Sequence, residues 1–328
     1  MKKSIINVLL VLIFGVIGCQ KIPLEPVNNV KTDNLKKHVL ELTSIGCRFN
    51  KPGGDFDVEF YRQIQSQKIS YITSELEKYG YRVSSEEFEP TFFGCYNQIK
   101  GINLFATKKG TAQPDKIIEL GAHYDTINGP GADDNCSGVA GVLEIARILA
   151  GVQTEKTIKF CFFDLEEWGL FGSRFHVSQI IKSKEDFDGI FVFEMIGYAT
   201  NAPNTQTTPL RIPIIFNPPK VGNFIVVVGN FKSAGLGRMY ESSIDKYVDN
   251  LEYYSANVIG GLIGDAARSD HQPYWQNGMK GIMITDTANF RNPNYHQKSD
   301  TINTLNFDFM TKVVKAMTVT LLECAEPN

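Results

Sequence analysis

Residues 157–173 read TIKFCFFDLEEWGLFGS and join an apolar, strand-like run to two adjacent glutamates, Glu166 and Glu167. Neighbouring carboxylates at the end of a buried strand repel each other unless positive charge lies beside them. A metal ion is the simplest source of that charge. The pair could instead favour the N-terminus of a following helix. A metal site is therefore indicated only if other parts of the chain supply further ligands.

Apolar strands and amphipathic helices alternate around this stretch. Strands are predicted at 81–88, 99–107, 116–120, 157–164, 189–195, 223–228 and 281–285, and helices at 58–79, 139–149, after Gly169 and at 310–321. This alternation predicts an α/β sandwich with a mostly parallel, mixed central sheet. Ligands gather at the carboxyl ends of the strands in such sheets. The long segment 199–220 is interpreted as either a pocket wall or a plain surface excursion.

The composition limits the classes of function. The chain has 328 residues, 43% of them hydrophobic, which is enough for a large core. The formal net charge is -3, so no basic face for nucleic acid is implied and no nucleic-acid partner is expected. The cysteines include no CxxC pair, so a cysteine zinc site is not indicated. A disulfide between Cys47 and Cys95 stays open.

The N-terminus looks like a processing segment. Lys2 and Lys3 precede a short apolar run, and residues 16–19, VIGC, resemble a bacterial lipobox. We expect a lipoprotein-type signal peptide at 1–18, lipidation at Cys19, a tether at 19–33 and one folded domain at 34–328. The expected location is the bacterial cell envelope, lipid-anchored on the periplasmic side or the surface, with membrane contact through the lipid alone. Secretion without an anchor is the alternative.

Two candidate ligands follow the strand predicted at 116–120. His123 and Asp125 are two residues apart, so both side chains project from the same side of a strand end. A histidine nitrogen can bind a metal while a nearby carboxylate orients the ring. Asp134 lies in GADDNCSG, residues 131–138, directly before a predicted helix. Helix capping explains one acid there, but not two acids and an asparagine.

The second half of the chain supplies further candidates. Glu194 lies in the apolar strand IFVFEMI, residues 190–196, where an unpartnered carboxylate would be costly. His296 lies in a polar loop. Oxygen and imidazole ligands without a thiolate suit zinc or a similar divalent ion. Asp270 and His271 resemble the start of a catalytic triad, but no G-x-S-x-G turn is present. A role in supporting the ligands is therefore preferred for them.

Five motifs together resemble the M28 family of metallopeptidases, the di-zinc aminopeptidase clan, from about residue 35 to the C-terminus. They are GAHYDT at 121–126, GADDNCSG at 131–138, FDLEEWGLFGS at 163–173, EMIG at 194–197 and YH at 295–296. The resemblance implies a three-layer fold of zinc-exopeptidase type that covers residues 34–328. It also implies zinc as the cofactor, with two ions per chain.

The resemblance assigns a role to each candidate. It implies that the zinc ligands are His123, Asp134, Glu167, Glu194 and His296. Asp134 would bridge the two ions, with Glu194 beside His123 on one ion and His296 beside Glu167 on the other. Glu166 is implied as the general base acting on a metal-bridging water, and Asp125 as the residue that orients His123. Many family members have Asp where this chain has Glu194, which is its main departure.

The implied function is zinc-dependent hydrolysis of peptide bonds that removes N-terminal residues from peptides or proteins. The alternative is a glutaminyl-peptide cyclotransferase, which shares the fold and uses one zinc; cyclases resemble this chain at 123–125, 166–167 and 270–271. Asp134, Asn135 and the direct run from Glu167 to 172–173 favour the peptidases. A non-catalytic binding module of the same fold is less favoured, because every ligand is kept in kind.

Overall fold

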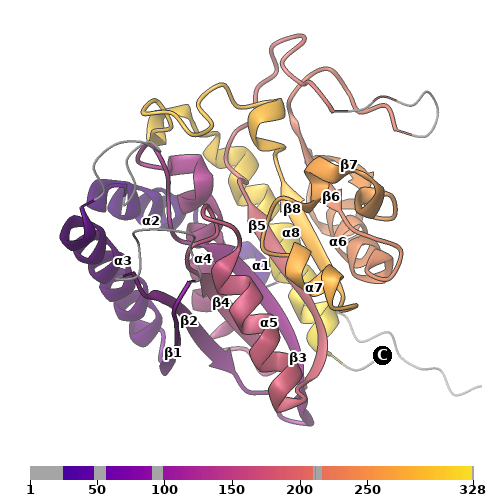
Figure 1. Cartoon of the computed structure of the whole chain (residues 1–328). Helices are drawn as coiled ribbons and strands as arrows, with labels where there is room; N and C mark the ends of the chain where they lie inside the picture. The colour runs from indigo at the N-terminus through magenta and orange to yellow at the C-terminus, as the bar shows by residue number, and fades with distance from the viewer. Residues whose placement is uncertain (1–24, 48–56, 91–98, 210, 212–215, 327–328) are drawn as a thin grey trace, which may run out of the picture.

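The computed structural model describes residues 25–47, 57–90, 99–209, 211 and 216–326 (Figure 1). An eight-stranded sheet has the order β1-β2-β4-β3-β5-β8-β6-β7. The strands are β1 (Val83–Phe88), β2 (Gly101–Lys108), β3 (Gln113–His123), β4 (Lys156–Phe163), β5 (Asp186–Glu194), β6 (Phe224–Val228), β7 (Glu252–Ala256) and β8 (Gly281–Thr285). The four central strands β4, β3, β5 and β8 are parallel, whereas β1, β2 and β6 pair antiparallel with their neighbours toward the centre.

Helices cover both faces of this sheet, as Figure 1 shows. They are α1 (Glu25–Asn28), α2 (Thr32–Ile45), α3 (Val58–Lys78), α4 (Gly138–Leu149), α5 (Phe171–Ser183), α6 (Ala234–Tyr247), α7 (Gln272–Gln276) and α8 (Phe307–Ala325). Helices α4, α6 and α8 pack on one face, and α5 and α7 on the other. The three-layer α/β sandwich expected from the sequence is therefore confirmed.

The central strands are apolar throughout because both faces of the sheet are covered. In β4 every residue from Thr157 to Phe163 is buried. Alternate side chains of β4 enter different cores: Phe160 and Phe162 pack toward α4 and α8, whereas Cys161 and Phe163 pack toward α5. Packing on both faces therefore fixes the position of the carboxyl end of β4, and the two glutamates follow shortly after that end.

The N-terminal part of the described chain is packed rather than extended. Val27 and Val30 are buried, and the backbone N–H of Lys31 donates a hydrogen bond of 2.7 Å to Glu144 on α4. The stretch predicted as a tether at 19–33 is therefore, from Glu25 onward, part of the folded domain. The signal peptide at 1–18 and the lipidation site Cys19 lie outside the described residues.

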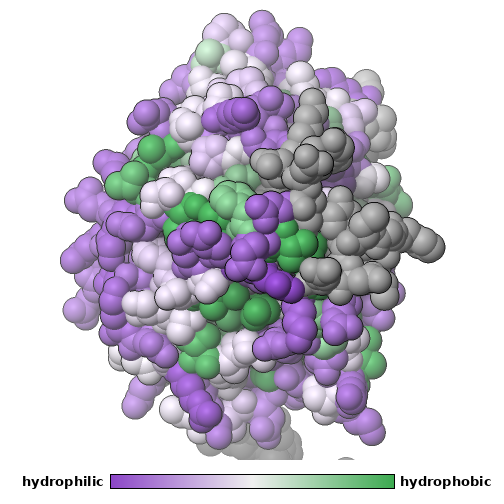
Figure 2. Space-filling view, turned by 60° about the vertical axis from the view of Figure 1, so that its left-hand side comes forward, coloured by the Kyte–Doolittle hydropathy of each residue, from purple (hydrophilic) through white to green (hydrophobic). Residues whose placement is uncertain are grey.

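The outer surface on this side is mainly polar. Figure 2 turns the side with α2 and α3 forward and shows a largely hydrophilic face, on which hydrophobic side chains form small separate groups. The apolar stripe of α3 faces inward, with Ile64, Ile72 and Leu76 buried. Among the described residues, no helix has the length and apolar character needed to cross a bilayer.

Candidate metal centre

The candidate residues lie at the carboxyl ends of the central parallel strands. β3 ends at His123, β5 ends at Glu194, and the paired glutamates follow β4. The ends of β3 and β4 are level, because His123 pairs with Phe163 in the ladder. Asp134 comes from η1 (Ala132–Ser137), the turn that enters α4. The fold therefore brings side chains from distant parts of the chain to one edge of the sheet.

His123 is fully buried and its ring is oriented from one side. The Nδ1–H group donates to the backbone carbonyl of Asp125 at 3.1 Å, and the Asp125 carboxylate lies 3.5 Å away. That carboxylate also accepts the backbone N–H groups of Glu166 at 3.1 Å and Glu167 at 3.2 Å. Asp125 thus positions both the imidazole and the backbone of the paired glutamates, and leaves Nε2 of His123 facing the site.

Asp134 lies between two imidazole rings. Its Oδ1 atom is 3.3 Å from Nε2 of His123, and its Oδ2 atom is 2.9 Å from Nε2 of His296. One carboxylate therefore presents each of its oxygens to a different histidine. Burial opposes its ionisation, but the adjacent imidazoles of His123 and His296 hold the pKa of Asp134 below its ordinary value.

The loop that carries Asp134 is held by its neighbours. The Asp300 carboxylate accepts the backbone N–H groups of Asp133 at 3.0 Å and of Asp134 at 3.1 Å. Asn135 donates to the Phe193 carbonyl at 2.8 Å and accepts the Met195 N–H at 3.1 Å, which ties the loop to the end of β5. The surplus of polar residues in GADDNCSG therefore positions one carboxylate rather than adding ligands.

The side chains of Glu166 and Glu167 belong to two different groups of candidate ligands. The Oε2 atom of Glu167 lies 3.0 Å from Nε2 of His296, so Glu167 joins Asp134 and His296. Glu166 instead joins His123 and Glu194, with ligand atoms within 4.8 Å of one another. Glu194 reaches the site with Oε2 at 3.4 Å from Nε2 of His123. The repulsion between adjacent carboxylates is thus reduced by separating the two side chains.

These residues fit divalent cations. Several buried polar atoms that face the site have no hydrogen-bond partner among the described residues: Nε2 of His123, Oδ1 of Asp134, Oε1 of Glu167 and Nε2 of His296. A buried polar atom without a partner costs free energy of folding, and a bound cation would supply the missing partner. Two imidazoles with carboxylate oxygens and no thiolate form a donor set typical of zinc. The two groups, joined by Asp134, therefore suit two adjacent ions.

The pKa values of the two glutamates are raised, which indicates that the described side chains supply too little positive charge to keep all the carboxylates ionised. Burial raises the pKa of Glu167 to about 8, and the nearby Asp134 adds to the rise. Burial also raises the pKa of Glu166 well above its ordinary value, although His123 opposes the rise, and Glu194 and Glu167 add to it. Carboxylates packed this closely in a dry environment stay ionised only beside cations.

Asp270 and His271 are both buried, but only Asp270 interacts electrostatically with residues of the candidate centre. Burial raises the pKa of Asp270 to about 7, with His123 opposing the rise and Glu194 adding to it. His271 turns away, because its Nε2–H donates to the Ala266 carbonyl at 2.8 Å and its ring packs edge-on against Trp275. The expected supporting role is thus consistent with the position of Asp270, whereas His271 holds its own loop together.

An apolar pocket adjoins the centre beside Glu194. Its cavity volume is about 110 Å³, it is open to solvent, and its apolar lining includes Phe216, Phe224, Val226, Val228 and Met283. The segment predicted as a pocket wall or surface excursion contributes Phe216 and residues 206–209, so the pocket-wall interpretation is correct for these described residues. Phe290 also lines the pocket, whereas Tyr274 is buried and donates a hydrogen bond to Glu119.

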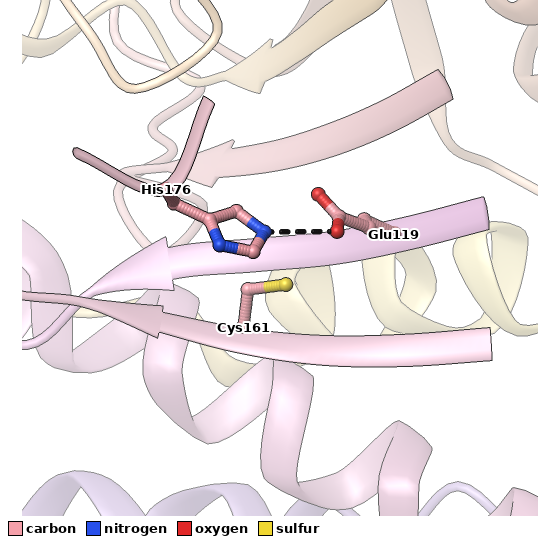
Figure 3. Close-up of side chains that lie close together, drawn as sticks. All are labelled: Glu119, Cys161 and His176. Carbon is pink, nitrogen blue, oxygen red and sulfur yellow. Dashed lines mark hydrogen bonds and ion pairs between the residues drawn. The ribbon is translucent and has the colours of Figure 1, made fainter. Parts of the chain in front are cut away.

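A third group of potential ligands, Glu119, Cys161 and His176, lies on the α5 side of the sheet (Figure 3). It differs from the first two because it already contains cations. The Nε2 atom of His176 is 3.0 Å from Glu119, and Nζ of Lys159 is 3.3 Å from the same carboxylate. Burial raises the pKa of Cys161 well above its ordinary value, so it stays a thiol. This group is a buried ion-pair network.

The network predicts a pH-dependent stability. His176 also contacts Glu86 at 3.0 Å, so although burial opposes the charge, Glu119 and Glu86 raise its pKa from 6.5 to about 9. The stabilisation is therefore complete below about pH 6.5 and is lost as pH rises through about 9. We expect His176→Gln to lower the free energy of unfolding by about 3 kcal/mol at pH 7. The difference from wild type should narrow to under about 1 kcal/mol at pH 10.

Urea unfolding of both proteins at pH 7 and pH 10 measures this effect. Lys182→Gln removes an exposed cation from the same helix and serves as the matched control, with an expected change of at most about 0.5 kcal/mol. His176 contacts the carboxylates of Glu86 and Glu119, and the Cys161 thiol lies beside it. Glu119 in turn contacts Lys159 and Tyr274, and Lys159 contacts Glu185. A difference that stays constant between the two pH values would contradict a protonated His176.

Comparison with known proteins agrees with this geometry. The family model for peptidase family M28 matches residues 103–321. The uncharacterized protein YfbL of Escherichia coli (strain K12) is 34% identical over 271 residues, which cover 78% of this chain and 79% of YfbL. The probable leucine aminopeptidase 2 of Aspergillus fumigatus is 26% identical over 221 residues. That match covers 62% of this chain but 40% of the fungal protein, so the chain spans less than half of that relative.

Solved structures share the fold. BSAP, a zinc aminopeptidase from Bacillus subtilis, superposes with a TM-score of 0.71 at 15% identity, covering 90% of this chain and 96% of BSAP. The glutaminyl cyclase of Porphyromonas gingivalis gives a TM-score of 0.64 at 17% identity, covering 90% of this chain and 98% of the cyclase. At such identities the likeness shows the fold alone. The family match and the YfbL relationship go further, and the chain belongs to peptidase family M28.

Proposed function

We propose that this protein is a zinc-dependent aminopeptidase with two zinc ions per chain. The observation that carries the proposal is the position of Asp134, whose two oxygens face the imidazoles of two separate ligand groups. His123 and Glu194 would hold one ion, Glu167 and His296 the other, and Asp134 both. Zinc bound there would act as a Lewis acid that activates water and polarises the scissile carbonyl.

Glu166 is the proton carrier in this proposal. Its side chain lies in the group with His123 and Glu194. Its backbone is fixed by Asp125. A carboxylate whose pKa is raised by burial is a better base toward water than an exposed one. Glu166 would take a proton from the attacking water at a carboxylate oxygen and deliver it to the leaving amine.

The substrate would be a peptide or protein N-terminus with an apolar first side chain. The carboxylates of Glu166 and Glu194 supply negative charge for a free ammonium group. The side chain of the first residue is attached to the same Cα atom as the ammonium group. It would enter the apolar pocket beside Glu194 and contact Phe216, Phe224 and Met283. Relatives named as leucine aminopeptidases are consistent with this class of substrate.

A screen of aminoacyl-p-nitroanilides with and without a chelator tests the function. We expect leucyl and phenylalanyl substrates to be hydrolysed at least about tenfold faster than glycyl or lysyl ones, because each apolar side chain buries surface in the pocket. Chelation should abolish the activity, and zinc should restore it. Hydrolysis that survives removal of all bound metal would rule out the proposed chemistry.

The glutaminyl-peptide cyclotransferase is the alternative favoured by the shared fold. It predicts one zinc per chain and conversion of Gln-peptides to pyroglutamyl-peptides without release of the first residue. Mass spectrometry of a Gln-Leu-containing peptide after incubation separates the two activities, because cyclisation releases ammonia whereas an aminopeptidase shortens the peptide. Metal analysis of the same sample gives the number of ions.

We also propose that Cys19 anchors the protein to the cell envelope. The support is the VIGC sequence at 16–19 that follows Lys2, Lys3 and an apolar run. Cys19→Ala should move the protein from the membrane fraction to the soluble fraction of expressing bacteria, as detected by immunoblot. Equal amounts of wild type and variant in the membrane fraction would reject the anchor.

A further inference from the structure

Glu194 has one interaction that sets it apart from the other candidate ligands. Its Oε2 atom accepts a hydrogen bond of 2.6 Å from the Ser269 hydroxyl, and the same oxygen lies 3.4 Å from Nε2 of His123. Ser269 is fully buried. The hydroxyl therefore donates its hydrogen bond to the same carboxylate oxygen that faces the imidazole. A carboxylate oxygen carries two lone pairs, so one remains directed at the site.

The Glu194 side chain is long enough to need a hydrogen-bond partner that fixes its orientation. Glutamate has one more rotatable bond than aspartate, and ordering that bond costs conformational entropy. The backbone at Glu194 is fixed by its pairing with Thr285 in β8, but that pairing does not fix the side chain. Among the described residues, it is the Ser269 hydroxyl that donates a hydrogen bond to the Glu194 carboxylate. The hydroxyl thus selects one orientation of a side chain that would otherwise sample several.

Ser269 is itself held rigidly. Its backbone carbonyl accepts the N–H of Gln272 at 2.9 Å, which closes the turn that starts α7. The residues just before it line the apolar pocket, with Ala266 and Arg268 in the wall. Ser269 therefore connects the pocket wall to the end of β5 and is not a mobile surface hydroxyl.

We propose that Ser269 is a positioning residue that holds Glu194 toward His123 and so sets the affinity of one zinc ion but not the other. The inference rests on the proposed zinc function. It concerns only the ion that His123 and Glu194 would hold, because among the described residues the Ser269 hydroxyl bonds to Glu194, whereas Glu167 and His296 pair with each other. Losing such an outer partner of a metal ligand typically costs about 10–100-fold in metal affinity.

Zinc binding to Ser269→Ala tests the proposal without use of activity. Metal-free protein is titrated with zinc sulfate in competition with a chromophoric chelator, which resolves the two dissociation constants. We expect one of them to rise about 10–100-fold and the other to stay within about twofold of wild type. Ser178→Ala, which removes an exposed hydroxyl on α5, is the matched control and should bind zinc like wild type. Urea unfolding of the metal-free proteins verifies that the fold is kept.

A double-mutant cycle distinguishes orientation of Glu194 from a general packing defect. In a Glu194→Ala background no carboxylate remains for the hydroxyl to hold, so Ser269→Ala should have no further effect. Wild-type affinity in the single variant, or an additional loss in the double variant, would overturn the inference. If wild type binds one zinc and Ser269→Ala weakens it, the inference stands and the two-ion count fails. If wild type binds no zinc, both fail.

Discussion

Glu166→Gln is expected to lower kcat for leucyl-p-nitroanilide by about 10²–10⁴-fold while the protein keeps its zinc. Glutamine has nearly the same shape as glutamate but cannot accept a proton. Glu166 belongs to the group with His123 and Glu194, but among the described residues no ion pair joins it to an imidazole, whereas Glu167 lies 3.0 Å from Nε2 of His296. Removing the charge of Glu166 should therefore stop proton transfer and leave the metal ligands in place.

Two measurements on this variant separate a base from a ligand. Metal analysis should give the wild-type number of zinc ions, and the dissociation constants should change by less than about tenfold, whereas loss of a true ligand would cost more. Glu59→Gln, at an exposed position on α3, is the matched control and should retain full activity. Turnover of Glu166→Gln within about threefold of wild type would remove Glu166 from the role of base.

The fold was largely predictable because its signal is local. The run at 157–164 is apolar at consecutive positions, which is typical of a strand covered on both faces, and β4 is such a strand. The edges were less accessible. The strand β7 is short and half exposed, with burial at Ala256 alone, so its sequence carries little hydrophobic pattern. The helix α2 was assigned in part to a tether, although Leu35, Val39 and Leu42 are buried at helical spacing.

The candidate ligands were predictable for a different reason. Each is a charged or imidazole side chain at the end of an apolar strand or in a turn, where the sequence offers no ordinary partner. The supporting residues carry no such signal. Ser269 is 75 residues from Glu194, and Asp300 is 166 residues from Asp134. Serine and aspartate in loops are common on protein surfaces. Only the folded chain shows that these two side chains are buried and directed at the site.

The separation of the paired glutamates also needed the structure. From sequence, Glu166 and Glu167 are equivalent neighbours, and their different roles came from family resemblance alone. In the fold, both backbone N–H groups bind one carboxylate, that of Asp125, so the two residues share a single anchor. From that anchor their side chains diverge into the His123 group and the His296 group. Asp125 thus acts on the centre through the backbone as well as through the His123 ring.

Asp134→Asn should have the broadest effect on metal binding. It keeps the shape of the side chain but removes the negative charge between His123 and His296, each of which lies within 3.3 Å of one of its oxygens. Because the two oxygens serve different groups, we expect both zinc dissociation constants to rise by about 100-fold or more. Activity at limiting zinc should fall in parallel. By contrast, Ser269→Ala should affect one constant only.

Zinc titration with a competing chelator reads out both constants, and Asp115→Asn, at an exposed position, is the matched control. A carboxylate shared by two cations would couple their binding, because its negative charge offsets part of the repulsion between them. Its loss should therefore weaken the second binding step more than the first. If Asp134→Asn weakens one ion and leaves the other at wild-type affinity, Asp134 binds a single metal and the centre consists of two independent sites.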